Sequence, residues 1–314
     1  MKTFKTTWPL LGSVLVLLAL FRVFVPSFLS SSNLLDLTQQ ISVNAILAFG
    51  MTLVILSGGI DLSVGALLAF TGTAATFSLL QSGLGLPMPV AVLAGVGLGA
   101  LFGFVNGTAV SRTSLPPFIV TLATMLIARG CALRFNEGRP MSIALTHESF
   151  LALGNGRIAG VPVPVVIMLV LFAVCALLLH RTRYGQHLYA LGGNREAALF
   201  TGIPVARVET LAYVLCGALA GVAGTIQTAQ LYSAEPASGQ GFELNAIAAA
   251  AVGGASFRGG RGTLLGTLLG AIIIGILDKG LNQAGVHFSI QYMVKGAVLI
   301  AAVSVDGWRQ KRAL

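Results

Sequence analysis

Charged and polar residues are scarce in this chain, and several lie within or beside apolar stretches. In "SGGIDLSVG" the carboxylate of Asp61 could bind a cation, relay a proton or lock a hairpin, because polar groups buried in a membrane usually serve a function. The sequence favours a simpler role for Asp61, capping a helix that begins there, with Ser63 assisting. The candidates for a polar solute pathway are Asn44, Asp61, Asn106, Glu243, Asn245 and Asn282.

Three charged residues, one of them already named, also have a plain structural interpretation. Arg129, Lys279 and Glu243 lie near the ends of apolar stretches, from which long side chains can reach the membrane surface. Lys295, between Met293 and Gly296, has no partner that the sequence indicates. Asp278 joins Asp61 as a carboxylate that could couple an ion to transport.

No catalytic or metal-binding pattern is present. The chain has no GxSxG and no HExxH, and its three cysteines, Cys131, Cys175 and Cys216, stand alone in apolar stretches. No lysine follows a glycine, which excludes a GxxxxGK[ST] phosphate-binding loop. We therefore expect no enzyme, no metal and no cofactor, and any ATP that drives this protein must be bound by another polypeptide.

The composition is that of a membrane protein. Of 314 residues, 55% are hydrophobic and only 9% charged, against roughly a quarter charged in soluble domains. The net charge of +9 comes from basic residues in short loops, which membrane orientation explains better than nucleic-acid binding.

Apolar stretches of roughly 20 residues predict membrane spans. We expect one all-α, polytopic domain over 1–314 with about ten spans, the first retained rather than cleaved, and the eighth short, tilted or re-entrant. The predicted spans are 8–25, 41–58, 62–81, 88–110, 117–134, 162–180, 209–229, 243–256, 263–282 and 289–306.

Basic residues set the predicted orientation. Starting inside, the cytoplasmic segments collect the majority of Lys and Arg, whereas the outer ones hold only Arg134, Arg139 and Arg157. The positive-inside rule then predicts that both termini are cytoplasmic. The basic residues assigned to the cytoplasm are Lys2, Lys5, Arg112, Arg181, Arg183, Arg195, Arg207, Arg258, Arg261, Arg309, Lys311 and Arg312.

Glycine spacing indicates how the spans pack. Glycines recur every fourth residue over 95–107 and 262–270, and once over 217–221, so each series lines one helix face and favours close contact within the chain. Residues 44–68 also match 245–269 at nine of 25 positions, including the Gly-Gly pairs 58–59 and 259–260. Repeats of this kind often flank a transport pathway.

A polar island interrupts the apolar pattern at 189–207. Asn194 is a good N-cap, Glu196 suits the first turn, and Gly202 followed by Pro204 ends a helix of about two turns. So short a helix is marginal alone. Either it lies on the membrane surface or it docks in a partner; the apolar side chains of 197–200 favour the partner.

Three segments resemble one family. "YALGGNREAALFTGI" is similar to the coupling loop of ABC-type sugar importer permeases, the group with ribose, xylose, arabinose and galactofuranose permeases. "SVNAILAFGMTLVILSGGIDLSVG" and "GFELNAIAAAAVGGASFRGGRGTLLGTLLGA" resemble the same family, the ribose permeases in particular. With "YSAEP" at 232–236, the resemblance covers roughly 33–306.

The resemblance to this family implies that the protein works together with other proteins. Such permeases work as two copies, with a cytoplasmic ATPase of two nucleotide-binding cassettes and a periplasmic sugar-binding protein. Within the cytoplasmic coupling loop, about 181–208, the residues that would dock on the ATPase are Gly192, Gly193, Asn194, Glu196, Ala197, Ala198 and Gly202. The outer loop 135–160 is less typical of the family.

The resemblance therefore implies a permease subunit that imports a monosaccharide, ribose or a related pentose or hexose, across the bacterial inner membrane by alternating access. Two alternatives remain open at this point: an ion-coupled secondary transporter of a small polar solute, and a passive membrane scaffold.

Overall fold

The computed structural model is a bundle of helices with very short strands. It describes residues 2–113 and 115–311, and the side chains of 8–113 and 115–304; the charged side chains of Lys2, Lys5, Arg309, Lys311 and Arg312 lie outside these. The helices are α1 (Lys2–Phe24), α2 (Ser31–Leu56), α3 (Val64–Leu79), α4 (Met88–Arg112), α5 (Pro117–Arg134), α6 (Glu148–Asn155), α7 (Val163–Arg181), α8 (Arg183–Gly193), α9 (Arg195–Phe200), α10 (Val205–Leu231), α11 (Phe242–Val252), α12 (Leu264–Gln283) and α13 (Phe288–Lys311).

The strands and one 3₁₀ turn lie at the α6 end. The turn is η1 (Phe135–Gly138), and the strands are β1 (Met141–Ser142), β2 (Arg157–Ile158), β3 (Val161–Pro162) and β4 (Ser233–Ala234). β1 pairs with β4 and β2 with β3, both antiparallel. The β1–β4 pair ties the outer loop to the segment that leads into α11.

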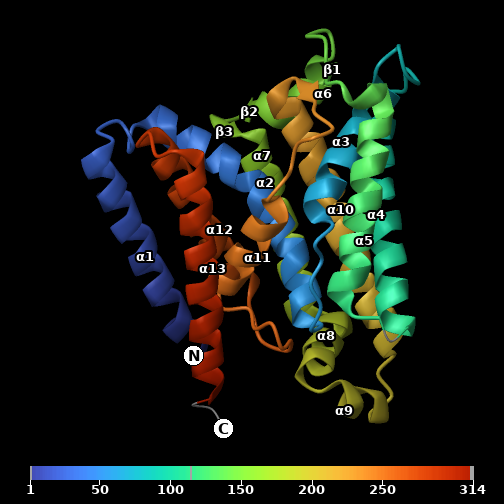
Figure 1. Cartoon of the computed structure of the whole chain (residues 1–314), viewed down its shortest axis with the longest axis vertical. Helices are drawn as coiled ribbons and strands as arrows, with labels where there is room; N and C mark the ends of the chain where they lie inside the picture. The colour runs from blue at the N-terminus through green and yellow to red at the C-terminus, as the bar shows by residue number, and fades with distance from the viewer. Residues whose placement is uncertain (1, 114, 312–314) are drawn as a thin grey trace.

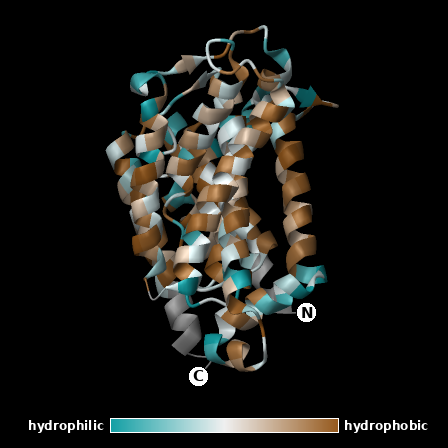
Figure 2. Cartoon of the chain, turned by 90° about the vertical axis from the view of Figure 1, so that its right-hand side faces the viewer, coloured by the Kyte–Doolittle hydropathy of each residue, from teal (hydrophilic) through white to brown (hydrophobic). Residues whose placement is uncertain are grey.

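The all-α membrane architecture predicted from the sequence is confirmed. Among the described residues, six helices are long and apolar enough to cross a membrane, namely α2, α4, α5, α7, α10 and α12. Four shorter apolar helices lie in α1, α3, α11 and α13, so each of the ten predicted spans corresponds to a helix. Hydrophobic residues dominate the middle of the bundle, and hydrophilic residues gather toward its two ends (Figure 2).

The helix pair α2–α3 and the helix pair α11–α12 run in the same directions through the bundle. In Figure 1, α2 and α11 run toward the α8–α9 end, and α3 and α12 run away from it. Their connections, 57–63 and 253–263, meet: a Cβ on Gly259 would lie 3.0 Å from the Gly58 nitrogen, and the Gly260 amide donates to the carbonyl of Leu56, the last residue of α2, at 2.9 Å. The Gly-Gly pairs that the sequence comparison aligned thus belong to connections that touch.

The glycine faces pack within the chain, as predicted. Gly99 of α4 abuts Gly217 of α10, and a Cβ on either glycine would collide with the carbonyl oxygen of the other. Gly103 and Gly107 also face α10, and Gly270 faces α11. Because none of these positions has a side chain, the helix backbones approach closely.

Candidate functional site

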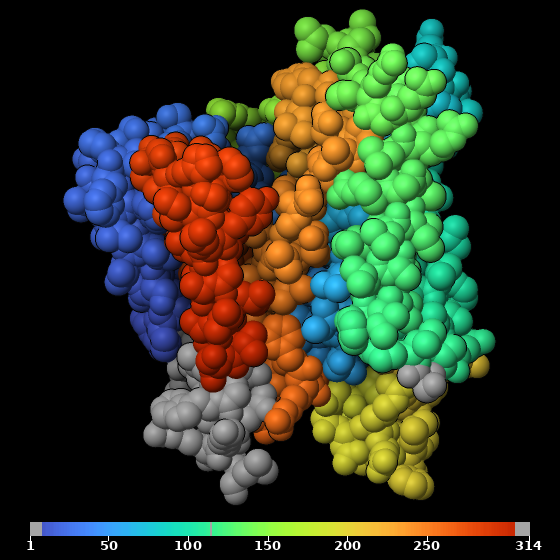
Figure 3. Space-filling view, in the orientation of Figure 1, coloured from blue at the N-terminus to red at the C-terminus, as the bar shows by residue number. Residues whose placement is uncertain are grey.

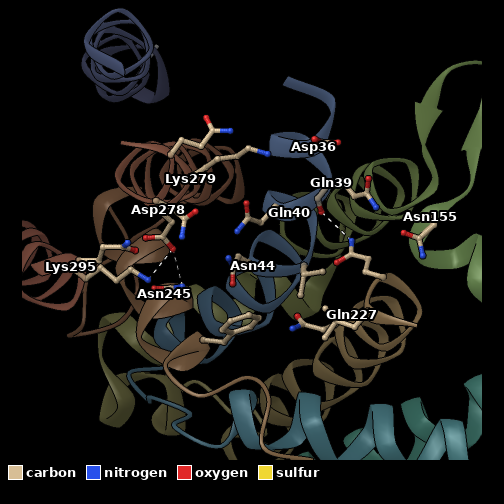
Figure 4. A pocket seen from close by; sticks show the side chains of 17 residues that line it. Asp36, Gln39, Gln40, Asn44, Asn155, Gln227, Asn245, Asp278, Lys279 and Lys295 are labelled. Carbon is tan, nitrogen blue, oxygen red and sulfur yellow. Dashed lines mark hydrogen bonds and ion pairs between the residues drawn. The ribbon is translucent and has the colours of Figure 1, made fainter. Parts of the chain in front are cut away.

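A polar cavity of about 730 Å³ lies between α2, α10, α11, α12 and α13 (Figure 4). Most of its wall consists of carboxamide and charged side chains. The lining residues are Asp36, Gln39, Gln40, Val43, Asn44, Asn155, Gln227, Gln230, Leu231, Phe242, Asn245, Asp278, Lys279, Asn282, Gln283, Gln291 and Lys295.

The cavity holds one ion pair. Lys295 Nζ of α13 lies 3.0 Å from Asp278 Oδ2 of α12, and Asn245 of α11 donates its amide to the same oxygen at 3.4 Å. Lys295, which the sequence left without a partner, thus links three helices. Lys279 also lines this cavity, so it does not need to snorkel to a membrane surface.

Two buried acceptors of lining residues lack a partner in the described part of the chain. Asn44 Oδ1 and Asp278 Oδ1 have no hydrogen-bond partner among the described residues. Both oxygens are almost wholly buried, so the groups that meet a solute are the accessible carboxamides of the lining. Amide side chains supply donors and acceptors together, which suits an uncharged, hydroxyl-rich solute.

The six predicted pathway residues divide into two groups. Asn44, Asn245 and Asn282 line the cavity, whereas Asp61, Asn106 and Glu243 do not. Hydropathy marks a polar residue inside a span without indicating which way it faces, and the pathway role of all six stays a prediction. Only for the first group does the geometry permit contact with a solute in this cavity.

Asp61 belongs to a buried hydrogen-bond chain. Its Oδ1 accepts from the Ser63 amide at 2.8 Å and from the Ser63 hydroxyl at 2.5 Å. Asn106 of α4 donates to that hydroxyl at 3.1 Å and accepts from Thr124 of α5 at 2.5 Å. The capping interpretation is correct in part: Asp61 holds an amide before α3, but Ser63 itself makes no side-chain cap bond.

Glu243 and Arg129 form hydrogen bonds with the irregular segment that leads into α11. Glu243 Oε1 accepts from the Gly241 amide at 3.1 Å. Arg129 of α5 donates to the carbonyls of Pro236 and Ser238, each at 2.7 Å. Both groups thus bond to irregular backbone at 236–241, and the snorkelling interpretation stays a prediction.

The short helix predicted at the polar island is present as α9. Asn194 Oδ1 accepts from the Ala197 amide at 3.0 Å, and Gly202 has φ +78° where the helix ends. The surface of α9 differs from expectation in one residue: Ala198 is only 3% exposed, whereas Phe200 is 91% exposed. In so short a helix, the side that carries Ala198 must pack on the bundle.

The helix α8 was not predicted as a separate element. Its end touches the end of α2 and the connection 253–263, because a Cβ on Gly192 would collide with the Leu56 carbonyl and the Gly260 amide. Tyr189 also donates to the Gly262 carbonyl at 2.9 Å. Burial raises the pKa of this tyrosine above its usual value, so its hydroxyl stays protonated as a donor.

Comparison with known proteins gives the family. Residues 33–303 match the sequence model described as "Branched-chain amino acid transport system / permease component". The chain belongs to this permease family. The permease is 45% identical over 300 residues to the ribose import permease protein RbsC of Escherichia coli (strain K12), covering 95% of this chain and 92% of the relative.

Other relatives are transport permeases as well. The ribose import permease RbsC of Bacillus subtilis (strain 168) is 44% identical over 97% of this chain and 93% of its own length. The L-arabinose transport system permease AraH of E. coli (strain K12) is 35% identical over 98% and 94%. No solved structure matches. The permease is thus a transport component rather than an enzyme, and among its described residues no group of three or more His, Cys, Asp and Glu side chains could hold a metal ion.

Proposed function

We propose that this permease is the membrane subunit of an ATP-driven importer and that a monosaccharide, ribose or a related pentose or hexose, passes through the polar cavity. The observation that carries the proposal is the lining, in which carboxamides from α2, α10 and α12 predominate. Sugar hydroxyls can donate to such oxygens and accept from such amides. The relatives named for ribose and arabinose transport support this substrate class.

A branched-chain amino acid fits the same cavity less well. Its aliphatic side chain needs an apolar wall. The described lining offers only Val43, Leu231 and Phe242 as apolar contacts among carboxamides and charges. The cavity therefore favours a polyhydroxyl solute over the class in the family's description.

The α8–α9 segment is the proposed cytoplasmic docking site for the ATPase, with both termini on the same side. Leu199 and Phe200 are 56% and 91% exposed on α9, and apolar side chains presented in this way suit a groove in a partner. Gly192 then carries movement of the segment to the end of α2 and to the connection 253–263, which it touches. The opposite end, with β1 and α6, would meet a periplasmic sugar-binding protein.

A second copy is proposed to cover the face between α5 and α13. The surface there is formed by the segment around α11 and, beside it, the segment that leads into α3 (Figure 3), and the backbone on either side of α11 is irregular over 235–241 and 253–263. Irregular backbone at membrane depth is tolerated only where protein covers it or water fills a cavity. A second permease on this face supplies that cover.

Transport by the complete importer tests the proposal. The permease is reconstituted into vesicles with its own ATPase and binding protein, and ATP-dependent uptake of labelled ribose, arabinose, allose and leucine is measured. Monosaccharide uptake is expected, with a loss of about tenfold in Asn44→Leu, since a lost buried hydrogen bond costs about 1–2 kcal/mol. Gln81→Leu, an exposed residue in the α3–α4 turn, is the control.

Two results would overturn this function. One is uptake of leucine without any monosaccharide. The other is uptake that continues on an ion gradient after the ATPase is removed, which would restore the secondary-transporter alternative.

A further inference from the structure

An apolar pocket of about 500 Å³ lies between α3, α5 and η1. The Phe135 ring centroid lies 6.1 Å from that of Phe70 and 5.3 Å from that of Phe77, so three aromatic rings form one continuous wall. The lining residues are Phe70, Phe77, Cys131, Arg134, Phe135 and Asn136. Arg134 is the one charged residue in this lining, so the pocket combines an apolar wall with a single positive charge.

The pocket lies along the ends of two spans, at the α6 end of the bundle. Phe70 and Phe77 are seven residues apart on α3, which is about 10 Å along the helix axis. Phe77 lies two residues before α3 ends, and Arg134 is the last residue of α5. The charge is therefore at the level where the spans end, and the aromatic wall extends into one half of a hydrocarbon core about 30 Å thick.

The pocket is on a different side of α5 from the face proposed to meet a second copy. Arg129 of α5 bonds to the carbonyls at 236–238, which belong to that face. Cys131 follows Arg129 by two residues, about 200° around the helix, and therefore projects from the opposite side. On that side Phe70 packs against Phe102 of α4, with ring centroids 5.3 Å apart.

The surface around the pocket faces lipid. Ile127 lies seven residues before Arg134, on the same side of α5, and is 59% exposed. Leu101 and Phe104 of the neighbouring α4 are 54% and 51% exposed. Both helices are long and apolar enough to cross a membrane, so acyl chains are the surroundings that such side chains suit.

The guanidinium of Arg134 lacks an ionic partner. The side chain is exposed and takes part in none of the ion pairs between described residues, and Glu137 close by is paired with Arg139 at 3.8 Å. A guanidinium binds phosphate through two parallel N–H donors. At the end of a span, a long side chain reaches the level of the lipid headgroups. The lining holds no carboxylate that would repel a negative headgroup.

We propose that this pocket binds one anionic phospholipid of the leaflet at the α6 end. An acyl chain lies against Phe70, Phe77 and Phe135, and the headgroup phosphate pairs with Arg134. The lipid also contacts η1, which leads into the outer loop and β1. The proposal concerns the membrane around the permease, so it does not depend on which solute the permease carries.

Lipid retention by the full-length permease measures the headgroup contact. The purified protein in detergent receives equal amounts of dioleoyl phosphatidylglycerol and dioleoyl phosphatidylethanolamine, and native mass spectrometry counts the bound lipids. Wild type is expected to retain the anionic lipid about fivefold more, which corresponds to about 1 kcal/mol for an exposed ion pair. Arg134→Gln is expected to lose this preference, and Arg134→Lys to keep part of it.

A matched variant and a native thiol locate the lipid. Arg139→Gln removes an exposed arginine outside the lining and is expected to keep the preference. Cys131 lines the pocket, whereas Cys175 and Cys216 are buried. Phosphatidylglycerol is therefore expected to slow the reaction of Cys131 with N-ethylmaleimide about fivefold in wild type and not in Arg134→Gln, as peptide mass spectrometry would show.

Three results would overturn the proposal. One is equal retention of the two lipids by wild type, or an equal loss of preference in Arg134→Gln and Arg139→Gln. Another is a Cys131 that reacts at the same rate with and without phosphatidylglycerol, because the lipid would then be bound elsewhere. The third is a bismaleimide that joins two permeases through Cys131, which would show that a second copy covers the pocket.

Discussion

Arg195 of α9 and Glu209 of α10 form an ion pair of 2.8 Å in which the Glu209 side chain is only 4% exposed. The pair joins the short helix to the first turns of a long span. Glu209 lies beside Val208, which is buried in the core, so α9 is tied to a fixed point of the bundle. A force applied to α9 by a partner would reach α10 through this contact.

We predict that Glu209→Gln weakens this tie and lowers ATP-dependent uptake while the complex still hydrolyses ATP. Arg195 is about half exposed, so the pair is worth about 1 kcal/mol, or about a fivefold change. Uptake and ATP hydrolysis are measured on the same vesicles. Gln81→Leu, at an exposed position in the α3–α4 turn, is the control. Equal uptake in the two variants would contradict the mechanical role.

The two glycines at the end of α8 provide a second test. Gly192→Ala places a methyl group against the Leu56 carbonyl and the Gly260 amide, whereas a Cβ on Gly193 meets nothing within 4 Å. We therefore expect Gly192→Ala to lower thermal stability and uptake, and Gly193→Ala to leave stability unchanged. The melting temperature of the purified permease measures the first effect. A stable Gly192→Ala permease would show that the connections have room to move apart.

Much of the fold was predictable, because a run of apolar residues must be buried in lipid or protein whatever it packs against. All ten spans follow from this, and α5 was predicted with the residues it has, 117–134. The same criterion set the start of α2 at residue 41, whereas the helix begins at Ser31, where Ser30 accepts the Asn33 amide. The ten missed residues include Asp36, Gln39 and Gln40, which face the cavity.

The candidate site was harder to predict from the sequence, because hydropathy alone sets where a predicted span ends. Hydropathy stops a span where polar side chains begin, so the ends of helices that line a polar cavity are read as loop. Gln227 and Gln230, three apart near the end of α10, share one helix face and could have indicated the cavity. The pairing of Lys295 with Asp278 depends on how two helices pack, and no spacing in the sequence predicts it.

Substitutions of Gly202 test whether the backbone conformation that ends α9 is needed for transport. Its φ is +78°, and a Cβ at this position would meet nothing within 4 Å, so only backbone conformation restricts the residue. A β-branched residue there costs about 1–2 kcal/mol, and asparagine costs less. We expect Gly202→Val to abolish uptake without blocking membrane insertion, and Gly202→Asn to retain most of it. Uptake at equal amounts of protein is the measurement, and wild-type uptake by Gly202→Val would count against the coupling role.

Substitutions of Asp61 test whether its carboxylate has a structural role or couples an ion to transport. Its Oδ1 accepts two hydrogen bonds from Ser63, and an asparagine keeps an oxygen at that place. We expect Asp61→Asn to retain ATP-dependent uptake and Asp61→Leu to lose folded protein, because the Ser63 amide and hydroxyl would then lack their acceptor. If Asp61→Asn folded but abolished uptake, a role in transport beyond packing would follow.

The contact between α4 and α10 gives a prediction about stability alone. Gly99 abuts Gly217, and a methyl group at position 99 would collide with the Gly217 carbonyl, whereas Gly97, two residues earlier on the same helix, has nothing within 4 Å. Both substitutions to alanine improve helix propensity equally, so their difference isolates packing. Overpacking costs about 1–3 kcal/mol. We therefore expect Gly99→Ala to unfold at a lower temperature than Gly97→Ala in detergent. Equal melting temperatures would mean that α4 can shift away from α10 at no cost, and the glycine face would then not determine how these two spans pack.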